Sequence, residues 1–247
     1  MKLVDLSTPY DSNYSCAMPP YPHGYTWEGE EYRFTWPYTA QRDGFFVTNI
    51  HISTHTGTHM DAPMHVFKRE DKEGMYYLGD IPLDRLYGDT VCWEIPRGEL
   101  EPITADDLEK ANEKLPIKED EFLLIYTHWG HKYFTVNANY MFYKSPGLNL
   151  DGAKWCVEKK IRGYGQDTIG TQWRGEIFLQ TEDKWKTGEK EHAEPVHKMM
   201  LGNDIILFEH LWNLDKIANR RVKCGFFPLP LQDREASPIR AVAFLDE

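Results

Sequence analysis

Short runs of hydrophobic and β-branched residues, separated by polar or glycine-containing segments, predict a series of β-strands along the chain. The clearest run, Phe122–Tyr126, consists of five consecutive hydrophobic residues. The predicted strands are Phe46–Ile52, Thr90–Ile95, Phe122–Tyr126, Gly163–Tyr164 running on to Asp167, Ile205–Glu209 and Ala241–Leu245.

Three segments have the pattern of helices: Thr104–Leu115, Asn149–Lys159 and Pro195–Leu201. Thr104 followed by Asp107 resembles a capping box with an aspartate at its third position. Pro195 suits the first position of a helix, and Gly202 the position just past its end. Strands and helices alternate through the second half of the chain, which predicts an α/β domain with a largely buried, mixed sheet.

Composition limits the partners of the protein. The chain has 247 residues, of which 41% are hydrophobic, enough for a substantial core. A formal net charge of −11 argues against nucleic acid and against a polybasic membrane anchor. There is no run of about 18 apolar residues and no visible signal peptide. We therefore expect a small-molecule substrate, and neither a nucleic-acid nor a membrane partner.

The four cysteines are widely spaced and form no Cys-x-x-Cys pair, which is typical of free thiols in a reducing cytoplasm. They are Cys16, Cys92, Cys156 and Cys224. A role as metal ligands would require the fold to bring them together.

Aromatic residues are concentrated in the first 46 residues, where Pro19, Pro20 and Pro22 exclude a regular helix. We interpret this segment as a loop packed on the core. The alternative is one wall of a binding pocket that contacts a planar ring, with the candidate residues Tyr21, Tyr25 and Trp27.

The segment His55-Thr-Gly-Thr-His59-Met-Asp61-Ala-Pro-Met-His65 places three imidazoles and a carboxylate within eleven residues. These ligand types suit zinc, manganese, iron or cobalt, so the segment predicts a divalent metal site. In an extended strand, the histidines and Asp61 would share one face, because all have odd numbers. Two imidazoles four residues apart would then be about 13 Å from each other, too far to bind one ion. We therefore expect a bend at Gly57 and a strand that runs into an irregular loop.

Other parts of the chain must complete such a site. Two candidates stand out: His197 on the predicted helix, and Glu209 at the end of an apolar strand, where α/β proteins commonly place functional groups. A half-buried helix histidine and a solvated strand-end acid are the alternative interpretations. The remaining candidates are His23, His51, His128, His131, His192, His210, Glu191, Glu194 and Asp204.

The segment from His55 to His65 resembles the signature of the cyclase family of metal-dependent hydrolases, which includes bacterial kynurenine formamidase and isatin hydrolase. Further similar segments are Asp5-Leu-Ser7, Pro20-Tyr-Pro22, Phe122–Thr127, Ser145–Leu148, Gly165–Thr168 and Pro238–Val242. The resemblance covers essentially the whole chain. It implies a single domain over residues 1–247, with an α/β swivelling β/β/α-type fold of a mixed sheet flanked by helices. It also implies a homodimer or homotetramer.

The resemblance further implies that His55, His59 and Asp61 hold one ion. Asp61 would bridge to a second ion, which His197 and Glu209 would complete. In the isatin branch, the resemblance implies that a similar set of residues holds a single manganese. We therefore expect one or two divalent ions, zinc or manganese. The chain departs from the family pattern in the loops 128–144 and 171–195, which could reshape the substrate pocket.

A divalent ion in such a site lowers the pKa of bound water towards about 7 and polarises a carbonyl. His65 suits the role of catalytic proton shuttle, and the resemblance assigns the matching histidine the same role. Its alternatives are a further metal ligand or a partner that orients Asp61. Thr58 is expected to hydrogen-bond locally and hold the bend.

We therefore predict a hydrolase of a small amide, formamide, cyclic imide or lactone. The alternatives are a metal-dependent cyclase or dehydratase of a small carbonyl acid, and a metal-bound ligand-binding module without catalysis.

Overall fold

The computed structural model describes residues 1–10, 33–38, 44–67, 75–133, 138–175 and 194–246. An eight-stranded mixed sheet forms its centre, in the order β1-β12-β11-β5-β7-β9-β10-β4. The strands are β1 (Lys2–Asp5), β4 (His59–Asp61), β5 (Tyr87–Glu94), β7 (Phe122–Tyr126), β9 (Gly163–Gln166), β10 (Ile206–Glu209), β11 (Arg220–Pro228) and β12 (Ala236–Leu245).

The sheet closes on itself through β12. One edge of β12 pairs with β11, and the other edge is shared by β4, over Ala236–Pro238, and β1, over Val242–Leu245. β5, β7, β9 and β10 run parallel, so their carboxyl ends lie at one rim of the barrel. β4 runs antiparallel to β10, which places the first residue of β4 beside the last residue of β10.

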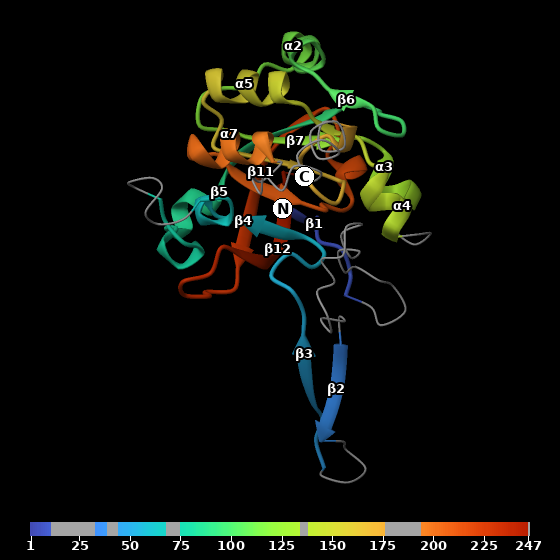
Figure 1. Cartoon of the computed structure of the whole chain (residues 1–247), viewed down its shortest axis with the longest axis vertical. Helices are drawn as coiled ribbons and strands as arrows, with labels where there is room; N and C mark the ends of the chain where they lie inside the picture. The colour runs from blue at the N-terminus through green and yellow to red at the C-terminus, as the bar shows by residue number, and fades with distance from the viewer. Residues whose placement is uncertain (11–32, 39–43, 68–74, 134–137, 176–193, 247) are drawn as a thin grey trace, which may run out of the picture.

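Three helices cover one side of the barrel (Figure 1): α2 (Ala105–Lys114), α5 (Leu150–Glu158) and α7 (Pro195–Gly202). A hydrophobic cluster that includes Trp93, Leu123 and Tyr164 lies between these helices and the sheet. β7 is buried along its whole length because it packs against the helices on one face and the barrel interior on the other.

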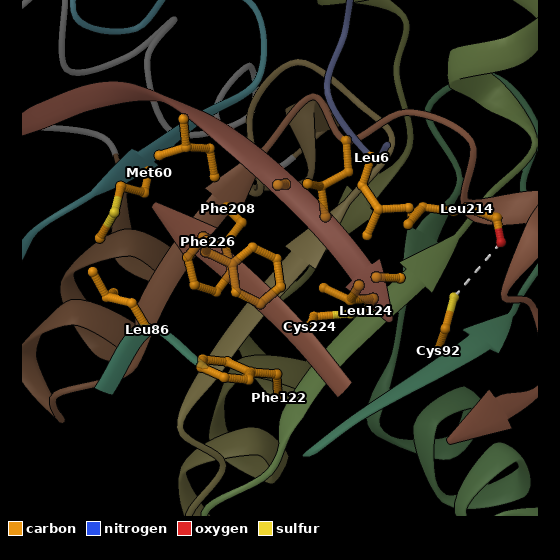
Figure 2. Close-up of a cluster of buried hydrophobic side chains, with 14 of the residues drawn as sticks. Leu6, Met60, Leu86, Cys92, Phe122, Leu124, Phe208, Leu214, Cys224 and Phe226 are labelled. Carbon is orange, nitrogen blue, oxygen red and sulfur yellow. Dashed lines mark hydrogen bonds between the residues drawn. The ribbon is translucent and has the colours of Figure 1, made fainter. Parts of the chain in front are cut away.

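The barrel interior is filled by a second hydrophobic cluster, which Figure 2 shows. The rings of Phe208 and Phe226 stack with centroids 3.9 Å apart, and Phe122 meets Phe226 edge-on at 5.0 Å. Such aromatic contacts add to the stabilisation that comes from burying the rings. Because residues along a strand alternate between faces, Leu123 next to Phe122 and Leu207 next to Phe208 point to the helices instead.

The predicted strands and helices are all present, with boundaries that shift by a few residues. The capping box of α2 is confirmed, since the Asp107 amide donates to Thr104 Oγ1 and the Thr104 amide donates to the Asp107 carboxylate. Gly202 is the last residue of α7 rather than the residue after it. β11 was not predicted, because charged residues interrupt its apolar pattern.

A two-stranded arm, formed by β2 (Arg33–Tyr38) and β3 (Val47–His51), projects away from the barrel (Figure 1). The smaller elements are α3 (Trp129–Tyr133), α4 (Ala138–Tyr143), the parallel pair β6 (Pro102–Ile103) and β8 (Gly147–Leu148), and the 3-10 turns Pro63–His65, Leu78–Asp80, Leu83–Leu86 and Leu214–Lys216. None of the helices in the described ranges has the length and apolar character to span a membrane.

Candidate metal centre

The histidine-rich segment leaves the arm at β3 and enters the barrel at β4. Gly57 has φ +61°, a left-handed conformation, and a Cβ at this position would lie 2.9 Å from Thr8 Oγ1. The predicted bend at Gly57 is therefore confirmed. The predicted strand that runs into an irregular segment is the short β4, which is followed by the 3-10 turn that ends at His65. The strand is shorter than predicted, because His55 lies in an irregular turn before it.

Thr58 holds the entry to β4 through distant partners. Its hydroxyl donates to the His210 carbonyl at 2.6 Å and accepts from the Thr8 amide at 2.7 Å. The expected local hydrogen bonds of Thr58 are thus replaced by contacts to remote segments. These contacts fix the backbone beside His59 to two other parts of the barrel.

His59 points its Nε2 towards two carboxylates. Its Nδ1 donates to the Gly57 carbonyl at 2.8 Å, which leaves the lone pair on Nε2. Nε2 lies 3.6 Å from Asp61 Oδ1 and 3.5 Å from Glu209 Oε2. His59 and Asp61 are each about 1% exposed, because alternate residues of β4 share the face that looks towards Glu209.

His197, on α7, reaches the same point from the helical side. Its Nε2 lies 3.2 Å from Glu209 Oε1 and 3.9 Å from Asp61 Oδ2. The Thr171 amide donates to Glu209 Oε1 at 2.6 Å and fixes that carboxylate. Burial alone would raise the pKa of Glu209, but the hydrogen bond from His197 and nearby histidine charge lower it to about 2. Burial alone would lower the pKa of His197, whereas the nearby carboxylates raise it to about 9.

His55 completes the cluster from the turn before β4. Its Nδ1 lies 3.1 Å from Asp61 Oδ1, and its Nε2 lies 3.6 Å from Glu235 Oε1. Burial alone would lower the pKa of His55, but these two carboxylates raise it to about 10. Burial likewise opposes ionisation of Asp61, but the surrounding histidines hold its pKa well below the ordinary value.

His65 lies beside both halves of the cluster. Its ring centroid is 4.3 Å from that of His55 and 5.8 Å from that of His197. Burial lowers the pKa of His65, and the charges of His55 and His197 act in the same direction, while Asp61 and Glu194 oppose them. His65 is therefore held towards its neutral form.

The arrangement fits a divalent cation. Asp61 Oδ1, Asp61 Oδ2 and His59 Nε2 are buried and have no normal hydrogen-bond partner among the described residues. Two ligands that each lie about 2.1 Å from one ion are at most about 4.2 Å apart. The distances from 3.1 to 3.9 Å within this cluster meet that limit. Three overlapping groups could hold an ion: His59, Asp61 and Glu209; His55, Asp61 and His65; and His65, Glu194 and His197.

All five predicted ligands and His65 thus meet in one place, and of the remaining candidates Glu194 reaches the cluster beside His65 and His197. Three other candidates lie elsewhere. His128 pairs with Glu94 at 2.7 Å, and Asp204 pairs with Arg85 at 2.7 Å. His131 contacts the Tyr126 hydroxyl. Several predicted residues lie outside the described residues: Tyr21, His23, Tyr25, Trp27, Glu191 and His192.

Sequence reasoning missed Glu235, whose carboxylate contacts His55. The available signal was its position directly before the Ala236-Ser-Pro238 start of the closing strand. A separate cavity of about 430 Å³ lies at the carboxyl end of β7, where Thr127, His128 and Trp129 form part of its lining. None of the predicted metal ligands lines it.

Comparisons with known proteins identify relatives of this chain. A family model described as "Putative cyclase" matches residues 4–172. Kynurenine formamidase of Bacillus anthracis is 28% identical over 244 residues, which cover 98% of this chain and 96% of that protein. Isatin hydrolase of Roseibium aggregatum is 27% identical over 212 residues, which cover 81% of this chain and 76% of that protein.

Solved structures show the same fold. An isatin hydrolase bound to the product analogue thioisatinate superimposes with a TM-score of 0.83 at 21% identity, covering 100% of this chain and 93% of that chain. A potential metal-dependent hydrolase with cyclase activity gives a TM-score of 0.70 at 24% identity, covering 100% of this chain and 98% of that chain. At these identities the likeness concerns the architecture alone.

Proposed function

Because this chain belongs to the cyclase family, we propose that it is a metal-dependent hydrolase of a small amide, formamide, cyclic imide or lactone. The observation that carries the proposal is the meeting of two buried carboxylates and three histidines, where three buried polar atoms of His59 and Asp61 have no hydrogen-bond partner among the described residues. Folding alone does not favour this arrangement, because burying polar groups without partners costs about 1–3 kcal/mol each.

The chain's own residues would bind and orient the cation. Asp61 faces both halves of the site, since Oδ1 faces His55 and His59 while Oδ2 faces His197. A divalent cation held here would polarise a carbonyl and lower the pKa of bound water towards about 7. The burial of the cluster keeps bulk water from competing for these contacts.

Zinc or manganese suits the site, because both accept imidazole nitrogen and carboxylate oxygen. Asp61 belongs to two of the groups that could hold an ion, one with His59 and Glu209 and one with His55 and His65, which supports two ions that share Asp61. His65 acts as the proton shuttle that protonates the leaving group. Its position between His55 and His197, at the edge of the cluster, supports this role.

The substrate class follows from the relatives, since one acts on a formamide and another on isatin, as their names state. The direct test is to strip the protein with a chelator and assay formylated anilines, isatin-like imides and lactones. Acid release that returns with zinc or manganese is the expected result. Unchanged activity after exhaustive chelation contradicts the proposal. Ring closure of an open acid would favour a cyclase, and tight binding without turnover would favour a binding module.

We also propose that residues 1–247 form one domain that assembles as a homodimer or homotetramer in the reducing cytoplasm. An isolated two-stranded hairpin is marginally stable in water. The arm nevertheless exposes Phe45, Phe46 and Ile50 by 54%, 62% and 61%, which supports its packing on a second copy. The thiols of Cys92, Cys156 and Cys224 are free and buried, which supports a location in the reducing cytoplasm. Analytical ultracentrifugation of Phe46→Ser should show dissociation if the arm forms the interface.

A further inference from the structure

We propose that Glu235 is a positioning residue that selects which nitrogen of His55 binds the metal. This role rests on the proposed function, because it requires that the site bind a cation. Glu235 would hold the proton of His55 on Nε2 and thereby present Nδ1 to the cation. His55 and His59 would then bind through different ring nitrogens.

The geometry around His55 is the first support. The imidazole lies between two carboxylates, with Nδ1 3.1 Å from Asp61 Oδ1 and Nε2 3.6 Å from Glu235 Oε1. A neutral imidazole has one protonated nitrogen and one lone pair, and only the nitrogen with the lone pair binds metal. Since Asp61 is at the centre of the cluster, Nδ1 faces the cation position and Nε2 faces Glu235.

Glu235 is itself held in place, which is the second support. The Thr54 hydroxyl donates to Glu235 Oε1 at 2.8 Å, and the Ala62 amide donates to the Glu235 carbonyl at 2.8 Å. The next residue, Ala236, is the register partner of Asp61 across β12 and β4. Segments on both sides of β4 therefore fix the carboxylate relative to His55.

His59 provides an internal comparison. Its Nδ1 donates to the Gly57 carbonyl, so its Nε2 points to Asp61 and Glu209. A backbone carbonyl thus sets the tautomer of His59, and a side-chain carboxylate sets that of His55. Metal-bound histidines commonly donate their other ring N–H to such partners, and loss of the partner typically weakens metal binding or activity about 10–100-fold.

The experiment compares wild type with Glu235→Gln and Glu235→Ala. Zinc affinity is measured by competition with a chromophoric chelator, and zinc content by elemental analysis. Because the Glu235 side chain is 36% exposed, we expect about a tenfold loss for Glu235→Ala, the lower end of the usual range, and a smaller loss for Glu235→Gln. Glu119→Gln is the matched control, since its exposed carboxylate pairs with Lys160 away from the site.

The second readout is the tautomer of His55. Long-range proton–nitrogen NMR of the zinc-loaded, nitrogen-15-labelled protein should show His55 protonated at Nε2. The signals of the His55 ring are assigned as those that disappear from the spectrum of His55→Gln. Thermal unfolding of the metal-free variants checks that each one folds. A zinc-loaded wild type with His55 protonated at Nδ1, or a folded Glu235→Ala variant with wild-type zinc affinity, overturns the role of Glu235.

These outcomes separate the two proposals. A wild-type protein that binds no zinc or manganese and hydrolyses no member of the panel contradicts the proposed function and, with it, the role of Glu235. A wild-type protein that does both, while Glu235→Ala matches it in affinity, contradicts the role of Glu235 alone.

Discussion

His59 and Glu209 are register partners across the antiparallel pair of β4 and β10, and the Nε2 of His59 lies 3.5 Å from Glu209 Oε2. The two residues come from distant parts of the chain, and the pairing of β4 with β10 places them side by side. Hydrogen bonds with the Gly57 carbonyl and the Thr171 amide then orient the two side chains towards each other.

Replacing either residue should remove metal as well as activity. We expect His59→Ala and Glu209→Gln to lower zinc content by at least one ion per chain, because each change removes a ligand from a buried set. Elemental analysis of the dialysed protein measures this loss. Metal that binds the native state stabilises it, so adding zinc should raise the melting temperature of wild type more than that of either variant. Full zinc content in both variants would place the ion elsewhere.

His65→Ala should separate binding from catalysis. If His65 is the proton shuttle, the variant keeps its metal and loses about 10²–10⁴-fold in kcat, the usual contribution of a general acid or base. Zinc content and steady-state kinetics on the same preparation provide the test. His131→Ala is the control, because that histidine contacts Tyr126 outside the cluster. Loss of zinc from His65→Ala would reassign His65 as a ligand.

Gly57→Ala should destabilise the protein and disturb the site. A left-handed conformation costs a residue with a Cβ about 1–2 kcal/mol. The new methyl would also lie 2.9 Å from Thr8 Oγ1, whose hydroxyl accepts from the Thr58 amide. Denaturant unfolding measures the stability, and zinc content reports on His59.

Gly44→Ala is the matched control for Gly57→Ala. Gly44 also has a positive φ, +81°, but a Cβ there has nothing within 4 Å among the described residues. Both variants share the backbone cost, so their difference in unfolding free energy measures the crowding against Thr8 and Tyr10. Equal losses in the two variants would show that these contacts can relax.

The capping box of α2 should make stability depend on pH. Burial alone would raise the pKa of Asp107, but hydrogen bonds from Arg97 and Thr104 hold it below the ordinary value of 3.8. A pKa that is lower in the folded state gives stability that is present above pH 3.8 and is lost as the pH falls through the folded value. Asp107→Asn should therefore cost about 1 kcal/mol at pH 7, the typical net contribution of a hydrogen bond, and progressively less below pH 4.

Unfolding in urea at several pH values measures this difference. Asp106→Asn is the control, because Asp106 lies in the same first turn of α2 and is exposed. A gap between Asp107→Asn and wild type that stays constant from pH 7 to pH 3 would contradict the assigned role of the carboxylate.

The sequence by itself determined the local structure of this protein. Thr104 and Asp107 begin α2 because their side chains satisfy amides at the helix start, and Phe122–Tyr126 forms a strand because every residue in it can be buried. Gly57 marks the bend, since glycine accepts a positive φ without cost. These features depend on residues close together along the chain, where spacing specifies geometry.

Only the tertiary structure decided which histidines of the described residues face one another. The family resemblance named His197 and Glu209, but their distances to Asp61 and His59 follow from closing the barrel between β10, β4 and β12. The contact of Glu235 with His55 depends on the same closure. Sequence spacing contains no information on such contacts, because they arise from strand pairing between segments that are far apart in the chain.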